Sequence, residues 1–406
     1  MLTTLGHLGY CSNIHAGESW NDHFEKLKTH IPVIKTKLSP AHAFGIGLRL
    51  SNVASLELRK EKNLEDFQQW LSANNCYVYT MNGFPYGSFH HTSVKDKVHA
   101  PDWTTVDRVQ YTIRLAQILA ALLPEGLEGG ISTSPLSYRF WHKEEDWPAV
   151  FETATMHVLQ VTEQLVKIKN ATGKTIHLDI EPEPDGLLGE SGEFIDWYVD
   201  YLRPIGYQYL QEKFNYSEEA ADADISAHVQ LCYDVCHFAI CYEDHQAVIN
   251  RLSNLGIKTG KIQISAALKA PLTTDREQRE KVISAFKSLD EPTYLHQVVA
   301  KQDDGNLLRY ADMPLALADA SNESVNEWRA HFHVPLFIES YGLLQSTRKD
   351  IEVVLAIHGQ EAFTSHLEVE TYTWEVLPPS LRVAMDESII RELSWVKTLI
   401  KEDQPA

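Results

Sequence analysis

The stretch KTIHLDIEPEP, from Lys174 to Pro184, alternates strictly between apolar and ionisable residues. Its apolar side chains share one parity, and the other parity carries His177, Asp179, Glu181 and Glu183. Successive side chains of a β-strand point to opposite faces, so one side of this strand is expected to be ionisable. Turn and loop residues (PDGLLGESGE) follow directly. The pattern predicts a strand that delivers polar groups to a shared centre.

Other short runs of the chain repeat this pattern, each apolar on one parity and polar at its end. Predicted strands lie in residues 8–16, 43–51, 75–87, 129–141, 174–184, 227–240, 261–270 and 366–378, with amphipathic helices between them. Strands that alternate with helices predict a parallel sheet, and eight such units indicate a closed (β/α)8 barrel. An open doubly wound sheet is the alternative, but the Gly-rich phosphate loop expected after its first strand is missing from SNIHAGESW.

The alternation of strands and helices is interrupted between the seventh and eighth predicted strands. YLHQVVAKQDDGNLLRYADMPLAL is typical of a β-hairpin with DDG as its turn, and EWRAHFHVPLF of another short strand. We therefore expect one barrel domain over residues 1–406, with a hairpin insertion at about 291–340.

Composition narrows the classes of function. With 44% hydrophobic residues and nine Trp among 406 residues, the chain is expected to form a globular core. A formal net charge of −20, with Lys and Arg scattered, argues against a nucleic-acid partner. The sequence has no apolar run of the roughly 20 residues that a membrane span needs, and no signal peptide is recognisable. The five cysteines form no C-x-x-C pair, so a cytoplasmic protein with reduced thiols is expected.

Four oxygen-bearing side chains end four consecutive predicted strands: Glu181, Asp234, Gln263 and Glu370. A TIM barrel carries its site at the carboxyl ends of its strands, so these groups are expected to converge. Three converging carboxylates repel one another, and a divalent cation relieves that repulsion. The donor set predicts a site for Mn²⁺, Mg²⁺, Co²⁺ or Zn²⁺. A buried hydrogen-bond network without a metal is the alternative.

His237 follows Asp234 by three residues, where the sixth strand turns into its helix, and is expected to reach the ligand or a second metal. Arg329, His331 and His333 share one parity of the HFH segment. Two interpretations of this segment stay open, as ligands of a second metal or as contacts to a phosphate or carboxylate of the substrate. His15, Arg49 and Asn82 stand at or near strand ends and are further candidates for substrate contacts.

The glutamate of the fifth strand, D-x-x-H of the sixth, a polar residue of the seventh and the glutamate of the eighth resemble the xylose isomerase-like TIM barrels. More closely, CSNIHAGESW, NGFPYG, LDIEPEPDG, CYDVCHFA, KIQISAAL, RAHFHVP and LEVETYTWEVLP resemble the EboE family of metabolite traffic proteins. These motifs run from Cys11 to Pro378. The resemblance implies metal ligation by the four oxygen-bearing side chains and acid–base roles for Glu181 and Glu370. It departs at Gln263, where the superfamily usually has His or Asp.

Three functions are weighed on these grounds. The first is a metal-dependent isomerase or epimerase that acts on a small sugar-like or polyol substrate, with or without a phosphate. The second is a non-catalytic metabolite-binding protein on the same barrel, which the neutral Gln263 favours. The third is a metal phosphoesterase of the endonuclease IV kind, which the net charge of −20 disfavours. The oligomeric state is left open.

Overall fold

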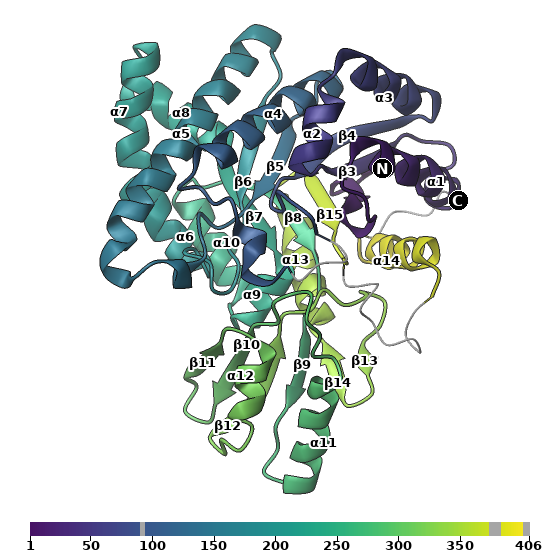
Figure 1. The fold of residues 1–406 in the computed structure, drawn as a ribbon, viewed down its shortest axis with the longest axis vertical. Helices are drawn as coiled ribbons and strands as arrows, with labels where there is room; N and C mark the ends of the chain where they lie inside the picture. The colour runs from purple at the N-terminus through teal and green to yellow at the C-terminus, as the bar shows by residue number, and fades with distance from the viewer. Residues whose placement is uncertain (90–93, 373–382, 401–406) are drawn as a thin grey trace.

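The centre of the molecule is a ring of eight parallel strands in a computed structural model that describes residues 1–89, 94–372 and 383–400 (Figure 1). The ring comprises β2 (Gly6–Tyr10), β3 (Phe44–Arg49), β4 (Cys76–Asn82), β5 (Gly129–Thr133), β6 (Ile176–Ile180), β7 (Val229–Asp234), β8 (Thr259–Ile264) and β15 (His366–Val369). Each strand from β3 to β8 pairs in parallel with the next, and β15 joins β8 to β2. A parallel bridge between Cys11 and Gly47 closes the ring, and β1 (Leu2–Thr3) pairs antiparallel with β2.

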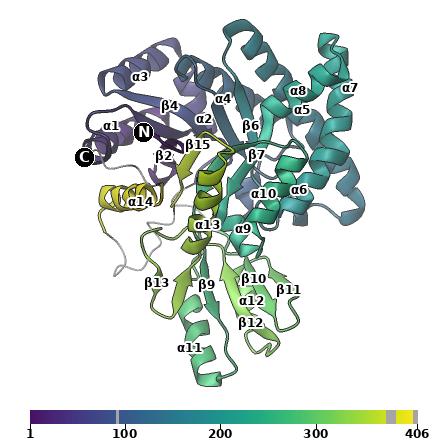
Figure 2. The same ribbon diagram turned by 180° about the vertical axis from the view of Figure 1, so that it is seen from behind.

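Helices cover the outside of the ring. They are α1 (Trp20–Leu38), α2 (Asn52–Leu58), α3 (Glu61–Ala73), α4 (Val106–Leu122), α5 (Trp147–Thr172), α6 (Ser191–Trp197), α7 (Arg203–Phe214), α8 (Glu218–His228), α9 (Val235–Ile240), α10 (His245–Asn254), α13 (Arg348–Gln360) and α14 (Met385–Leu399), with a π-helical turn at Tyr198–Leu202. Short 3₁₀ segments lie at Ser12–Ile14, Lys95–His99, Arg139–Trp141 and Glu144–Asp146. The view from behind places α13 and α14 beside β15 (Figure 2). The predicted α/β barrel is confirmed.

Local chemistry sets several helix ends. Ser19 accepts a hydrogen bond from the backbone N–H of Asp22 and begins α1. Gly173 ends α5 with a positive φ of 72°, a conformation that glycine adopts without strain. Asp234 caps α9 by accepting from the N–H of His237, which fixes the turn from β7 into the site.

A six-stranded antiparallel sheet extends from the barrel between β8 and β15 (Figure 1). Its elements are β9 (Leu268–Pro271), α11 (Arg276–Lys287), β10 (Val298–Gln302), β11 (Leu307–Tyr310), α12 (Met313–Ala318), β12 (Val325–Ala330), β13 (Ser340–Tyr341) and β14 (Leu344–Ser346). The expected hairpin is β10–β11, with the DDG turn between its strands. The inserted segment is larger than residues 291–340, because it already begins with β9, which the sequence analysis joined to β8 as one strand over residues 261–270. The strand expected through the HFH segment ends at Ala330 instead, and His331–His333 lie in the loop that follows.

The interior of the ring is polar below the site. Lys261 pairs with Glu368, and its Nζ also donates to Ser132 Oγ at 3.0 Å. Glycines provide the space for these groups: a Cβ on Gly47 would stand 1.7 Å from Glu368 Oε1. Bulky branched residues usually fill a TIM-barrel interior, so this core is arranged around charge.

Among the described residues, helices long and apolar enough to cross a membrane are not found. All five cysteines are buried and none forms a disulfide.

Candidate active site and metal centre

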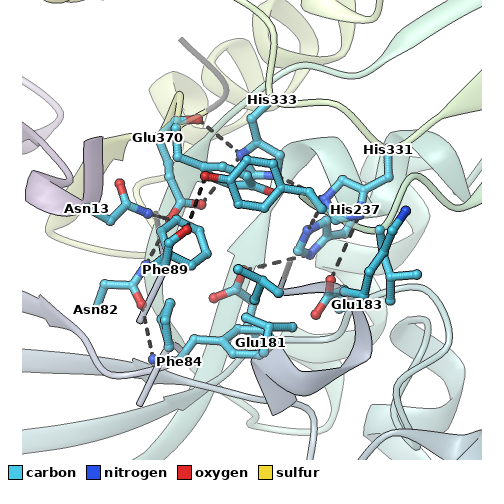
Figure 3. A pocket seen from close by; sticks show the side chains of 17 residues that line it. Asn13, Asn82, Phe84, Phe89, Glu181, Glu183, His237, His331, His333 and Glu370 are labelled. Atoms are coloured by element: carbon cyan, nitrogen blue, oxygen red, sulfur yellow. Dashed lines mark hydrogen bonds and ion pairs between the residues drawn. The ribbon is translucent and has the colours of Figure 1, made fainter. Parts of the chain in front are cut away.

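A pocket opens at the carboxyl ends of the ring strands and encloses about 520 Å³, part of it open to solvent (Figure 3). Its polar lining comes from β-strand ends and from the loop after β12: Asn13, Asn82, Glu181, Glu183, His237, His331, His333 and Glu370. Aromatic rings supply another part of the lining: Phe84, Phe89, Tyr294 and Tyr372. The pocket therefore combines converging ionisable groups with apolar surface, as small-molecule sites do.

Glu181, Asp234 and Glu370 form a carboxylate cluster around the amide of Gln263. Gln263 Nε2 lies 3.0 Å from both Glu181 Oε1 and Asp234 Oδ2, and it also contacts Glu370 Oε2. An amide nitrogen carries two hydrogens, so it cannot donate fully to three carboxylates at once. The cluster thus needs protons or a cation in addition to Gln263.

The electrostatics of the carboxylate cluster favour the protonated acids. Burial, together with the charges of Glu370 and Asp234, raises the pKa of Glu181 well above its usual value. Burial and the charge of Asp234 raise the pKa of Glu370 to about 8. The positive charge of Lys261, which lies below the cluster in the barrel interior, lowers both pKa values, but Lys261 is already paired with Glu368.

Two amides hold Glu370 in place. Asn13 Nδ2 and Asn82 Nδ2 donate to Glu370 Oε1 at 2.7 and 2.8 Å. Asn82 is itself fixed, because its Oδ1 accepts the N–H of Phe84 at 3.0 Å. The carboxyl of Glu370 therefore has a defined orientation in the pocket wall.

His237, His331 and His333 form an imidazole cluster beside the carboxylates. The Nδ1 atom of each ring faces an oxygen that can only accept: Pro182 O at 2.8 Å, Gln297 Oε1 at 2.7 Å and Glu370 O at 3.1 Å, respectively. The amide orientation of Gln297 is set in turn, because its Nε2 donates to Pro184 O at 3.0 Å. Each Nδ1 therefore carries the proton, and each neutral ring presents an unprotonated Nε2.

The Nε2 atoms of the imidazole cluster point toward one another. His331 Nε2 lies 3.2 Å from His237 Nε2 and 3.1 Å from His333 Nε2 (Figure 3). Burial lowers the pKa of His333 to about 4 and that of His331 well below its usual value, which keeps both rings neutral. Facing lone pairs repel, whereas nitrogens bound at ~2.0–2.1 Å to one tetrahedral ion lie roughly 3.3–3.4 Å apart, close to the two distances here. The arrangement fits a divalent cation.

Additional donors lie within reach of the imidazole cluster. Glu181 Oε1 is 3.7 Å from His237 Nδ1, and Glu183 Oε1 is 3.8 Å from His331 Nδ1. Potential ligand atoms of Glu183, His237 and His331 lie within 4.8 Å of one another, as do those of Cys236, His331 and His333. The carboxylate cluster meets the same limit. The site thus offers two adjoining places for a cation.

The structure brings together eight of the residues singled out from the sequence: Glu181, Asp234, Gln263, Glu370, His237, Asn82, His331 and His333. Gln263 is present, but its amide nitrogen occupies the centre of the carboxylates instead of presenting its oxygen there. Amide orientation follows from the hydrogen-bond network, so a cation at that centre would require the amide to turn.

Three predicted substrate contacts lie elsewhere. His15 contacts the Tyr10 hydroxyl at 2.8 Å and stacks on His30. Arg49 ends β3 and donates to Gly87 O, with Glu18 at 3.5 Å. Arg329 pairs with Glu327 at 2.9 Å and lies over the ring of Tyr242. Because β12 ends after Ala330, Arg329 and His331 do not share a strand face.

The sequence interpretation missed Asn13 and Gln297, which take part in the site through contacts distant in sequence. Asn13 stands in the quoted motif CSNIHAGESW, so its position at a strand end was the available signal. Gln297 lies inside the predicted hairpin region, and nothing in its local sequence indicates a role. His90, His91, Trp374 and the end of the LEVETYTWEVLP motif lie outside the described residues.

No family model and no curated protein matches the sequence. Solved structures with a similar chain trace include an L-ribulose 3-epimerase, at 10% identity and a TM-score of 0.49 over 98% of this chain and 95% of that one. A putative sugar phosphate isomerase/epimerase from Anabaena variabilis has 10% identity and a TM-score of 0.49 over 97% and 98%. A xylose isomerase-like TIM barrel protein from Mycobacterium smegmatis in complex with magnesium has 11% identity and a TM-score of 0.48 over 98% and 97%.

Proposed function

We propose that this protein is a divalent-metal-dependent isomerase or epimerase of a small polyhydroxylated substrate. The observation that carries the proposal is the imidazole cluster, whose three Nδ1 atoms all donate and whose Nε2 atoms face one another. Acids with raised pKa values, Glu181 and Glu370, line the same pocket. A cation site next to tunable acids suits proton transfer beside a carbonyl.

We assign the cation to His237, His331 and His333, with Asp234, whose Oδ1 lies 3.9 Å from His237 Nε2, as the oxygen donor on the Nε2 side. Three nitrogen donors favour Zn²⁺ or Co²⁺ over Mg²⁺. When bound, such a cation polarises a carbonyl or hydroxyl of the substrate and stabilises the negative charge that develops there. We propose a second cation site formed by Glu181, Asp234, Gln263 and Glu370. Binding there requires the Gln263 amide to rotate so that its oxygen faces the cation.

The two glutamates divide the proton transfers in this proposal. Glu181 follows β6 and Glu370 follows β15, and their carboxylates converge to within 4.8 Å of each other at the amide of Gln263. One carboxylate removes the proton of the carbon next to the carbonyl, and the other carboxylic acid returns a proton. Asn13 and Asn82 hold the Glu370 carboxyl at a fixed angle for this step. Phe84 and Phe89 give the pocket lining apolar surface beside these groups.

The test is incorporation of deuterium from D₂O into ketoses, aldoses and inososes (keto-cyclitols) incubated with the Zn²⁺-loaded protein, followed by proton NMR. We expect exchange at a carbon next to the carbonyl for at least one compound. Glu181→Gln and Glu370→Gln should each lower the exchange rate at least 100-fold, while Glu387→Gln, an exposed change on α14, leaves it intact. Undiminished deuterium exchange in both Glu181→Gln and Glu370→Gln would contradict the assignment of these glutamates as acid and base.

A metabolite-binding protein without catalysis is the second candidate. The amide of Gln263 at the centre of the carboxylates favours it, because a neutral hydrogen-bonded centre needs no metal. This candidate predicts saturable ligand binding and no deuterium exchange. The phosphoesterase alternative finds less support, since the pocket lining is acidic and the chain carries a net charge of −20.

We also propose membership of the xylose isomerase-like superfamily and of the EboE family, on the motifs between Cys11 and Pro378. The convergence of Glu181, Asp234, His237 and Glu370 in one site supports the superfamily.

A further inference from the structure

One side of the pocket is a cluster of aromatic rings that stands apart from the barrel core. The ring centroids of Phe89, Tyr294 and Tyr372 lie 5.1–5.4 Å from one another, and Val94 and Val98 pack against them. Among the described residues, this group forms a cluster of its own beside the main apolar core. Its rings line the pocket instead of filling the barrel interior.

The aromatic cluster faces the ionisable groups across the pocket. Tyr372 lies 4.6 Å from the ring of His333, centroid to centroid, and the same pocket is lined by Phe84, Phe89 and Leu295. The Tyr294 hydroxyl donates to Phe89 O at 3.2 Å, so its polar end is turned to backbone. The lining that the cluster gives the pocket is therefore largely aromatic.

The charge of the pocket restricts what binds there. Glu181, Glu183 and Glu370 all line it. Among the described lining residues the one Lys or Arg is Lys95, and its Nζ lies 2.7 Å from Asp312 Oδ2. Asp312 is held by the N–H groups of His296 and Met313. Lys95 is thus already paired, and a phosphate dianion would find no unpaired Lys or Arg among the described lining residues.

We propose that the site takes an uncharged polyol that bears an apolar, ring-sized substituent, and that it discriminates against sugar phosphates. The inference rests on the proposed function and specifies its substrate class. The hydroxyl-bearing part lies against Glu181, Glu370 and the imidazole cluster. The substituent lies against Phe89 and Tyr372, where aromatic faces make offset or edge-on contacts.

The experiment uses matched sets of three compounds built on a hexose, a pentose and an inositol: the free polyol, its monophosphate and its monobenzyl ether. Dissociation constants are measured by calorimetry on the Zn²⁺-loaded full chain. We expect the benzyl ether of at least one set to bind tenfold or more tightly than its parent and its phosphate. A phosphate that binds best, or benzyl ethers without advantage in all three sets, overturns the proposal.

Phe89→Ser tests the assignment to the aromatic cluster. It should remove the advantage of the benzyl ether, while Phe140→Ser, an exposed phenylalanine outside the pocket lining, should keep it. An advantage that persists in Phe89→Ser contradicts the proposal. The ranking is a binding result that needs no turnover. If the benzyl ether binds most tightly but no deuterium exchange occurs, the isomerase proposal is rejected and the substrate-class inference stands. If exchange occurs but the benzyl ether has no advantage, the isomerase proposal stands and the substrate-class inference is rejected.

Discussion

At the scale of single residues, the chemistry of the site depends on hydrogen bonds that select one tautomer of each histidine. Pro182 O, Gln297 Oε1 and Glu370 O each accept from an Nδ1 atom. Outer contacts of this kind orient metal-binding histidines and tune their basicity. Two of the three acceptors are backbone carbonyls, so Gln297 is the side chain through which this arrangement can be tested.

Gln297→Leu should weaken metal binding without unfolding the chain. Without the amide oxygen, the neutral ring of His331 can carry its proton on Nε2 instead of Nδ1. The lone pair of Nε2 is then no longer available to the metal. We expect Zn²⁺ affinity to fall by roughly 10–100-fold, measured by competition with a chromophoric chelator. Gln302→Leu, at the far end of β10 and outside the pocket lining, is the control. Equal affinities of the two variants would show that Gln297 does not position the imidazole.

Glu392 predicts a pH dependence of stability. It is buried on α14 and accepts from Thr371 Oγ1 at 2.7 Å and from Leu336 N at 3.2 Å, and burial raises its pKa from 4.5 to about 7. The folded protein therefore keeps a proton that the unfolded chain releases above pH 4.5. The free energy of unfolding should fall by about 3 kcal/mol as pH rises from 4.5 to 7 on account of this group.

Glu392→Gln keeps the accepting oxygen and removes the titration. Urea unfolding at pH 5 and pH 8 should show a smaller loss of stability for this variant than for the parent. Glu387→Gln, exposed on the same helix, should follow the parent. An unchanged difference between the two pH values in Glu392→Gln would mean that the buried carboxyl does not titrate in this range.

At the scale of elements, the ring strands carry polar groups inward where small residues leave room. Gly47 is the sharpest case, because it lies on β3 at the bridge that closes the ring and opposite Glu368. A side chain there would displace a carboxylate that Lys261 holds.

Gly47→Ala should therefore destabilise the fold. The added Cβ would lie 1.7 Å from Glu368 Oε1 and 2.9 Å from the backbone oxygen of Tyr10. We expect a loss of about 1–3 kcal/mol in urea unfolding, the range for overpacking. Gly87→Ala, where the added Cβ meets nothing within 4 Å, should cost far less. Similar values for both changes would show that the ring tolerates the added methyl.

Strand periodicity also decided what the sequence alone could predict. Glu181, Asp234, Gln263 and Glu370 were found because each stands at the inward-facing end of a strand with clear alternation. His331 and His333 were found as a pair, although their segment is a loop. Arg329 was grouped with them wrongly, because parity holds only while the strand continues. Asn13 and Gln297 act through partners 357 and 34 residues away, which no local pattern encodes.

At the scale of the whole molecule, eight repeated β/α units predicted the barrel, whereas the extent of the inserted sheet did not follow from periodicity. Its strand β9 pairs with β12 and β14, which come more than 50 residues later, and such pairing is invisible in a local window. The insertion matters for the site because it supplies Tyr294, His331 and His333.

The overall charge yields a prediction of its own. A chain with net charge −20 and an acidic pocket should not bind DNA, because phosphate contacts need clustered cations. Fluorescence anisotropy of a labelled duplex at low salt should show no binding in the micromolar range. Binding that weakens with added salt would revive the phosphoesterase alternative.

Titration with Co²⁺, followed by visible absorption, tests most directly whether His237, His331 and His333 hold a divalent cation. If they do, a ligand-field band should appear and saturate at one equivalent of Co²⁺. The band should be lost in His331→Ala and His333→Ala and kept in the control His157→Ala, a histidine of α5 outside the pocket lining. A band that persists in both site variants but disappears in Asp234→Asn would place the metal at the carboxylates, and no band at all would contradict the metal centre.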